Sequence, residues 1–303
     1  MMKLKKPVEF VIAGGLGNQM FMLCAGLYFA EKYNREVKFD ISDLQRISLL
    51  HPGLNVYSLG LLKEDQISKK PRRAKNLQIE AFGARYLAKT KRLLNQIYQR
   101  RNIKIQEIGF YDLNLIPPKS KRVEGYFQSW RYFSSLEGKP KLTIASILKP
   151  TDWYLKESQS LQEKKFAAFH IRRGDYVLSA NRSNGILSIS YFKSVAELLP
   201  IDIDILVFTD SSEAIIFELN ELGRKFRVIK PPEESDPVES LLLMKLASHI
   251  AISNSTYSWW AATIAEPGTT VYAPTKWFEL RDDPIELLPD HWIRVKSDWK
   301  KQK

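Results

Sequence analysis

Short apolar runs alternate with helix-like segments in the second half of the sequence, and this alternation restricts the fold more than any other feature. Apolar strands are expected at 166–171, 203–209, 226–229, 250–253 and 270–273. Helix-like segments lie between them, at 190–199, 212–222, 238–248 and 259–265. Such strand–helix repeats build a parallel sheet with helices on both faces. The sequence therefore predicts an α/β fold with a doubly wound sheet in this half.

The first half begins with the same kind of unit. An apolar strand at Val8–Ala13 runs into the glycine loop Gly14–Gln19, and a buried helix is expected at Met20–Ala30. A chain of 303 residues exceeds the usual size of one core, so one large or two medium domains are expected. We place two domains at 1–150 and 151–303, and the packing of the last helix back on the first domain is one alternative.

Charge is shared unevenly between these halves. Residues 1–150 carry 27 Lys and Arg against 12 Asp and Glu, a net +15, whereas residues 151–303 carry 19 against 22, a net −3. The basic residues are densest at 69–75, and 67–103 is expected to form one or two basic amphipathic helices. This asymmetry predicts an anionic partner for the first domain, which nucleic acid, a phosphorylated substrate or a membrane surface would satisfy.

The sequence also indicates where the chain works. No apolar stretch approaches the length of a membrane-spanning helix, and Val8–Ala13 is too short for a signal-peptide core. Cys24 is the only cysteine, which excludes disulfides within one chain. We expect a cytoplasmic protein, with peripheral contact at the inner face of the membrane as one alternative.

Polar clusters follow three of the strands predicted in the second half. They are His170/Arg172/Asp175, Thr209/Asp210 and Asn254/Ser255/Thr256. The carboxyl ends of parallel strands meet at one edge of a sheet, so these clusters should converge on one ligand site. Paired arginines at a strand exit suit a diphosphate, because guanidinium groups pair bidentately with phosphate oxygens.

Several segments taken together resemble the α-1,2-fucosyltransferase family, glycosyltransferase family 11. The resemblance runs from residue 8 to about 295 and rests on six motifs. They are Gly14-Gly-Leu-Gly-Asn-Gln-Met-Phe21, Glu124-Gly-Tyr-Phe-Gln-Ser129, His170-Ile-Arg-Arg-Gly-Asp-Tyr-Val177, Phe208-Thr-Asp210, Ser253-Asn-Ser-Thr-Tyr-Ser-Trp-Trp-Ala261 and Ala273-Pro-Thr-Lys-Trp-Phe278.

The resemblance implies a GT-B-type architecture, in which two Rossmann-like domains face each other across a cleft. It implies GDP-β-L-fucose as donor, inversion to an α-1,2 linkage on a terminal sugar such as β-galactose, and no metal or other cofactor. The acceptor would be an oligosaccharide of a surface glycan or O-antigen, and a lipid-linked form is one alternative.

The resemblance also implies roles for individual residues. Arg172 would bind the donor diphosphate with help from His170 and Arg173, and Asp175 would orient that arginine or touch the guanosine. The remaining donor-binding residues would be Gly15, Gly17, Asn18, Gln19, Thr209, Asp210, Asn254, Ser255, Thr256 and Ser258.

The general base is left open by the sequence. The family often places an acidic residue where this chain has Ser240, and Glu239 precedes it. Glu239 is therefore a candidate base, although a carboxylate near a helix start also has a structural use. Asp112 and Asp175 are further candidates.

Three other functions are weighed against this one. A metal-dependent sugar transferase would use Asp202-Ile-Asp204, but this motif begins a strand and so points away from the ligand edge. A nucleic-acid-binding protein would interleave aromatic residues with its basic cluster, and 69–75 contains none. An inactive sugar-binding relative would not need the intact His170/Arg172/Asp175 set.

Overall fold

The computed structural model of the chain describes residues 7–42, 44, 56, 61–68, 102–116, 120–136, 150–173 and 184–300. Residues 1–140 and 141–303 form two compact units. The division predicted at 150/151 falls beside the segment 137–149, which lies outside the described residues, so the boundary stays a prediction. The predicted basic helices at 67–103 also lie almost wholly outside the described residues.

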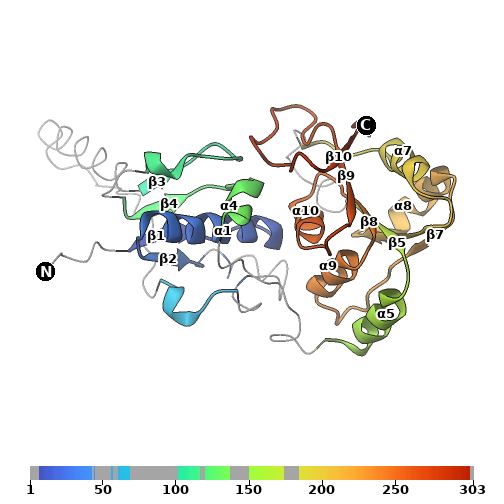
Figure 1. The fold of residues 1–303 in the computed structure, drawn as a ribbon, viewed down its shortest axis with the longest axis horizontal. Coiled ribbons are helices and arrows are strands. Elements are labelled where there is room, and N and C mark those ends of the chain that lie inside the picture. The colour runs from blue at the N-terminus through green and yellow to red at the C-terminus, as the bar shows by residue number, and fades with distance from the viewer. Residues whose placement is uncertain are drawn as a thin grey trace, which may run out of the picture. The chain divides into compact units, whose positions relative to one another are not determined.

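Unit 1 (1–140) is a parallel sheet of order β2-β1-β4-β3 (Figure 1). Its strands are β1 (Val8–Val11), β2 (Val37–Asp40), β3 (Asn102–Lys104) and β4 (Arg122–Glu124). Two short 3₁₀ turns, η1 (Glu64–Gln66) and η2 (Leu113–Leu115), and the helix α4 (Trp130–Ser134) complete the described part.

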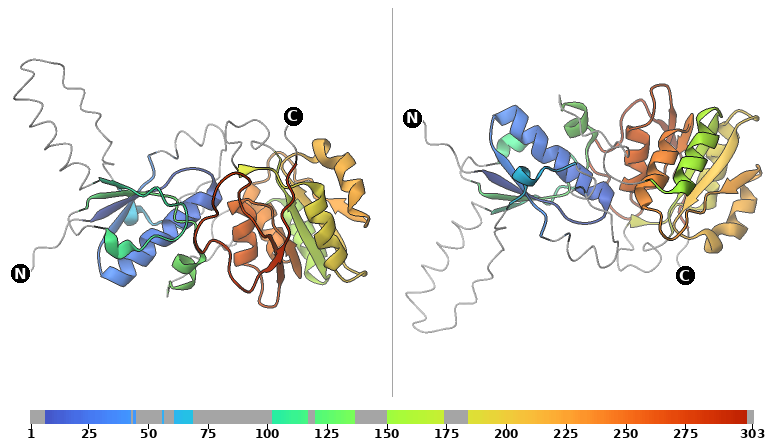
Figure 2. Two further views of the ribbon diagram at one scale, coloured as in Figure 1. Left: turned by 90° about the horizontal axis from the view of Figure 1, so that it is seen from above. Right: turned by 90° about the horizontal axis from the view of Figure 1, so that it is seen from below.

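The helix α1 (Leu16–Tyr33) covers one face of this sheet (Figure 2). It packs closely because Gly26 has no side chain: a Cβ there would lie 2.5 Å from the ring of Phe39. The helix ends at Asn34, whose φ of 45° is the left-handed conformation common at helix C-termini. The predicted strand–glycine loop–helix at the start of the chain is thus confirmed.

Unit 2 (141–303) is a parallel sheet of order β10-β9-β8-β5-β6-β7. Its strands are β5 (Phe166–Ile171), β6 (Asp204–Thr209), β7 (Phe226–Val228), β8 (His249–Ala251), β9 (Thr270–Pro274) and β10 (Ile293–Val295). Every residue of β5 is buried, as expected for a central parallel strand.

Helices cover both faces of this sheet (Figures 1 and 2). The helices α5 (Asp152–Gln162), α9 (Pro237–Lys245) and α10 (Thr256–Thr263) pack together on one face. On the other face, α7 (Ile189–Leu198), α8 (Ser212–Leu219) and the 3₁₀ turn η5 (Asn220–Leu222) bury a second apolar layer. The predicted doubly wound sheet is confirmed, and each unit has the Rossmann-like α/β form expected of a GT-B-type chain. The cleft expected between the units stays a prediction.

The end of the chain differs from the prediction. Within the described stretch 275–300 no helix follows α10. Instead β10 pairs with β9 and extends the sheet, so the expectation of a last helix is wrong. Apolar residues of this stretch pack in the core: Trp277, Phe278 and Trp292 are buried.

Candidate active site

The polar clusters predicted to converge do lie on neighbouring strands. β5 is flanked by β6 on one side and β8 on the other, and all three run parallel. Residues that follow these strands therefore share the carboxyl edge of the sheet, where open α/β sheets bind ligands. The chain brings together His170, Arg172 and Arg173 from β5, Thr209 and Asp210 from β6, and Ser253–Ser255 after β8.

His170 is the last residue but one of β5 and is 5% exposed. Its Nδ1 is 2.9 Å from Ser253 Oγ, and its ring centroid is 5.5 Å from that of Tyr257. Burial, reinforced by the charge of Arg172, lowers the pKa of His170 to about 3, and Asp210 opposes this shift. The imidazole is therefore neutral at physiological pH and acts as a hydrogen-bonding group, not as a cation.

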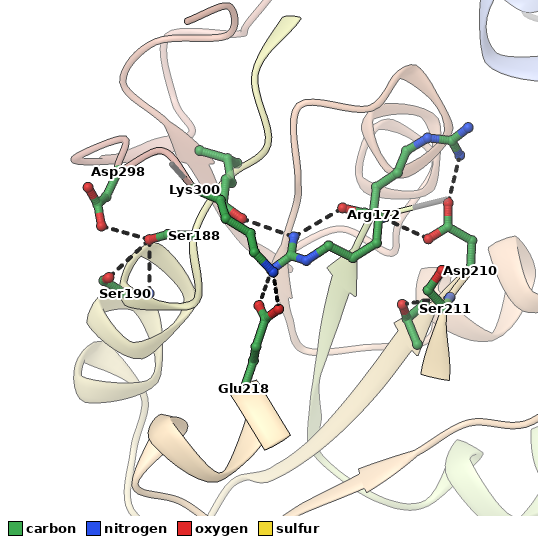
Figure 3. Close-up of polar contacts among 11 residues, drawn as sticks. Arg172, Ser188, Ser190, Asp210, Ser211, Glu218, Asp298 and Lys300 are labelled. Carbon is green, nitrogen blue, oxygen red and sulfur yellow. Dashed lines mark hydrogen bonds and ion pairs between the residues drawn. The ribbon is translucent and has the colours of Figure 1, made fainter. Parts of the chain in front are cut away.

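Arg172 is the arginine that reaches the accessible part of the sheet edge. Its side chain is 26% exposed, and its guanidinium Nη1 lies 3.7 Å from Asp210 Oδ2 (Figure 3). The same carboxylate accepts a hydrogen bond of 2.8 Å from the backbone N–H of Arg173. Asp210 thus orients Arg172, the function that the resemblance assigned to Asp175, which lies outside the described residues.

Arg173 lies elsewhere than the resemblance implies. Its side chain is 3% exposed and ion-paired with Glu218 of α8, with Nη2 2.9 Å from Oε2. Its Nη1 donates to the carbonyl oxygens of Leu187 and Arg172. Arg172 is therefore partly exposed beside Asp210, while Arg173 is buried beside Glu218 of α8.

The polar side chains of the turn after β8 bond mainly to backbone groups of the chain itself. Ser255 caps α10 by accepting from the N–H of Tyr257, and the buried Ser258 Oγ donates to the Ser255 carbonyl. Asn254 Nδ2 donates to the carbonyl oxygens of Asn184 and Gly185. Thr256 is half-buried at the start of α10. These groups shape the edge around the N-terminus of α10.

On β6, Thr209 Oγ1 accepts from the N–H of Ser211 and closes the turn that carries Asp210 (Figure 3 labels Asp210 and Ser211). The hydroxyl therefore fixes the strand exit. This places Thr209 as a support for Asp210.

Glu239 is buried away from solvent, at 1% exposure. Its carboxylate accepts from the N–H and hydroxyl of Thr151, at 2.6 and 2.9 Å, and from the Ser235 hydroxyl. It therefore ties the start of α5 to the start of α9. This geometry favours the structural use of Glu239 over the candidate base.

The glycine loop of unit 1 is braced from several directions. Gln19 is fully buried; its Nε2 donates to the Gly14 carbonyl and its Oε1 accepts from the Val56 N–H. Gly14 has a φ of 76°, a conformation that favours glycine. Gly15, at the N-cap of α1, is exposed, and Gly17 is buried in its first turn.

Asn18 on this loop accepts a hydrogen bond of 2.8 Å from Gln128 Nε2. Gln128 follows β4, which pairs with β1, so two strand exits of unit 1 are joined by this amide pair. The motifs at 14–21 and 124–129 are therefore neighbours. The donor role of Gly15, Gly17, Asn18 and Gln19 stays a prediction.

Asp112 lies in unit 1, where its carboxylate caps η2 by accepting from Asn114. Asp204 begins β6 and Asp202 lies in the turn before it, so both lie at the amino end of the strand, away from the ligand edge, as predicted for them. Among the residues that the structure describes, no three His, Cys, Asp or Glu side chains come together as metal ligands. None of the helices in the described ranges has the length and apolarity needed to cross a bilayer.

Sequence reasoning missed several partners of the site. Ser253 and Tyr257 contact His170, and both stand inside a motif quoted for the family, so that motif was a usable signal. Glu218 gave no signal, because a lone carboxylate in the last turn of an amphipathic helix resembles many surface residues.

The described residues thus form two Rossmann-like units, one with an arginine–carboxylate pair at its sheet edge. The family model of "Glycosyl transferase family 11" matches residues 3–292. The chain belongs to this family and is a glycosyltransferase.

Among known proteins the chain is similar to an "Alpha-1,2-colitosyltransferase" of Escherichia coli, with 28% identity over 94% of this chain and 98% of that protein. It is also similar to the "O-antigen biosynthesis glycosyltransferase WbnK" of Escherichia coli, with 29% identity over 42% of this chain and 44% of that protein. A solved structure, fucosyltransferase NodZ from Bradyrhizobium, covers 86% of this chain and 94% of its own at 14% identity and a TM-score of 0.43. That likeness is too distant to add to the argument.

Proposed function

We propose that the chain is an inverting α-1,2-fucosyltransferase that moves L-fucose from GDP-β-L-fucose to the 2-hydroxyl of a terminal β-galactosyl residue. The observation that carries this proposal is the pair of Arg172 and Asp210 at the carboxyl edge of β5 and β6. A partly exposed guanidinium held by a carboxylate is preorganised for an anionic ligand.

Transfer of the sugar needs a cationic group beside the donor diphosphate. Breaking the sugar–phosphate bond leaves the electron pair, and therefore negative charge, on the GDP β-phosphate. Arg172 stabilises that charge by ion pairing. A divalent cation has this role in metal-dependent transferases. Neutral His170, held by Ser253, shapes the same edge without adding a second fixed positive charge.

The acceptor hydroxyl must lose its proton as its oxygen attacks the anomeric carbon from the face opposite GDP. Asp175 and Asp112 are the proposed candidates for this base. Glu239 is the weaker candidate, because its buried carboxylate already accepts three hydrogen bonds from Thr151 and Ser235.

The named relatives support an acceptor of the O-antigen type, since one is called an O-antigen biosynthesis glycosyltransferase. They also favour a second candidate for the sugar that is transferred. One relative is called a colitosyltransferase, and colitose is the 3-deoxy form of L-fucose. The same diphosphate clamp would serve either GDP-sugar.

The basic first half supports a further part of the proposal: a lipid-diphosphate-linked acceptor at the inner face of the cytoplasmic membrane. Residues 1–150 carry a net +15, and anionic lipid attracts basic segments at close range. Neutralising the Lys and Arg of 69–101 should weaken liposome binding and turnover on a lipid-linked acceptor. Unchanged binding and turnover would remove the membrane from the proposal.

The deciding experiment measures GDP release from GDP-fucose and from GDP-colitose, with and without a β-galactoside acceptor, in EDTA. Acceptor-stimulated release is expected for wild type, with a loss of at least about a hundredfold in Arg172→Ala, the size seen when a charge-stabilising donor is removed. NMR of the product then reads the linkage and anomeric configuration. A product with retained configuration, or release that requires a metal, would overturn the mechanism.

A further inference from the structure

We propose that Glu218 is a positioning residue of the donor site: it holds Arg173 in the core and thereby aims Arg172 at the ligand edge. The inference rests on the proposed function, because it gives Arg172 the donor diphosphate as its ligand. Glu218 lies outside all the motifs that define the family resemblance.

Arg173 is a buried cation, and Glu218 is its counterion. The arginine side chain is 3% exposed, and its Nη2 lies 2.9 Å from Glu218 Oε2. The other carboxylate oxygen, Oε1, is paired with Lys300 (Figure 3). A buried charge is tolerated only when it is paired and hydrogen-bonded, so Glu218 decides whether the Arg173 side chain stays inside.

Anchoring Arg173 fixes its backbone as well as its side chain. The Arg173 N–H donates to Asp210 Oδ1 at 2.8 Å, while Asp210 Oδ2 faces Arg172 Nη1 at 3.7 Å. The turn is therefore held from the core side by Glu218 and from the edge side by Asp210. Holding Arg173 inward therefore fixes the backbone from which Arg172 reaches the edge.

The contrary assignment makes Arg173 a second ligand of the diphosphate. To reach the diphosphate, the Arg173 guanidinium would have to break its hydrogen bonds to Glu218 and to the Leu187 carbonyl. Both acceptors would then lose a charge-assisted hydrogen bond. The two assignments predict opposite results when both members of the pair are replaced by apolar residues.

The test is the dissociation constant of GDP for the full chain and its variants Glu218→Met, Arg173→Met and the double variant. Glu218→Met leaves Arg173 buried without a counterion and should weaken GDP binding at least about tenfold, as lost charged hydrogen bonds do. The double variant should return to within about threefold of wild type, because replacing a whole buried ion pair by apolar groups is often neutral. Arg173→Met alone should cost less than Glu218→Met, since Glu218 keeps Lys300.

A matched control is the Glu157–Arg227 pair of the same unit, whose nitrogen and oxygen atoms lie 3.0 Å apart. Glu157→Gln breaks an arginine–glutamate pair of the same kind, with the arginine 49% exposed, and should leave GDP affinity unchanged. If instead Arg173 binds the diphosphate, Arg173→Met and the double variant will both bind GDP at least about tenfold more weakly than wild type, and the inference is overturned.

A second readout does not need the nucleotide. Hydrogen exchange of the Arg173 amide, followed by NMR, should speed up at least about tenfold in Glu218→Met, because the hydrogen bond to Asp210 opens more often. It should not change in Glu157→Gln. If wild type binds no GDP, the proposed function fails and the exchange rates alone decide the inference: faster exchange supports it, and unchanged exchange overturns it.

Discussion

At the scale of single residues, two neighbours in the sequence differ in their exposure to solvent and in their partners. Arg172 and Arg173 follow the same strand, yet one is 26% exposed beside Asp210 and the other is 3% exposed beside Glu218. His170 shares its side of the strand with Arg172 and is buried without charge. The site thus places one cation at the edge, and keeps the other within the core.

His170 makes folding sensitive to acid in a defined window. The pKa of His170 is about 3 in the folded chain, against an ordinary 6.5. Between these two pH values the unfolded chain therefore binds a proton at this imidazole, whereas the folded chain does not. Stability is therefore lost as pH falls from 6.5 towards 3. Between pH 7 and pH 5 this group should cost about 2 kcal/mol of unfolding free energy.

The measurement is urea unfolding of wild type and His170→Asn at both pH values, followed by tryptophan fluorescence. Six of the seven tryptophans lie in residues 151–303, so the signal reports mainly on unit 2. The carboxylates titrate in both proteins, and only wild type should show the extra loss. Equal losses would mean that His170 titrates normally in the folded chain.

At the scale of elements, α5 and α9 are joined at their N-termini by one carboxylate. Glu239 in the first turn of α9 accepts from Thr151, the N-cap of α5, across 88 residues of sequence. The carboxylate accepts from the N–H and hydroxyl of Thr151 and from the Ser235 hydroxyl just before α9, whereas Asp236 caps α9 itself.

Glu239→Gln separates the structural role from the catalytic one. We expect a loss of about 1.5–3 kcal/mol in the unfolding free energy, the size of a hydrogen bond to a charged group, with turnover per folded molecule retained. Thr151→Val, which removes the partner hydroxyl, should follow the same trend in urea unfolding. A collapse of turnover with unchanged stability would make Glu239 the base after all.

At the scale of the whole molecule, each unit has its own sheet and core, so a ligand of one sheet edge should stabilise one unit first. GDP at a hundred times its dissociation constant should stabilise the bound state by about 2.7 kcal/mol. Hydrogen exchange with mass spectrometry should show protection at the exits of β5, β6 and β8 in unit 2, with β3 of unit 1 unchanged.

The glycine loop Gly14–Gln19 is the informative exception in that experiment. Protection there on GDP binding would support its proposed donor role, because only a segment that meets the nucleotide should gain protection. Exchange unchanged at 14–19, with protection in unit 2, would confine the nucleotide site to the second unit.

Much of this architecture was predictable from the sequence, because apolar runs of strand length and helical spacing are local signals. The strand predicted at 166–171 matches β5 residue for residue, and the polar clusters after β5, β6 and β8 were predicted to meet. The last helix failed as a prediction because residues 293–295 pair with β9 and form β10, and such long-range pairing is not a local signal. The basic segment 69–101 lies outside the described residues and stays a prediction.

The sequence by itself determined the order of the elements, the positions of the motifs and the sheet edge on which they gather. These depend on hydrophobic period and on the rule that parallel strands share their exits. Only the tertiary structure decided which polar group contacts which. Arg173 finds Glu218 across 45 residues and Thr151 finds Glu239 across 88, and such pairings arise from helix packing, which no local pattern encodes.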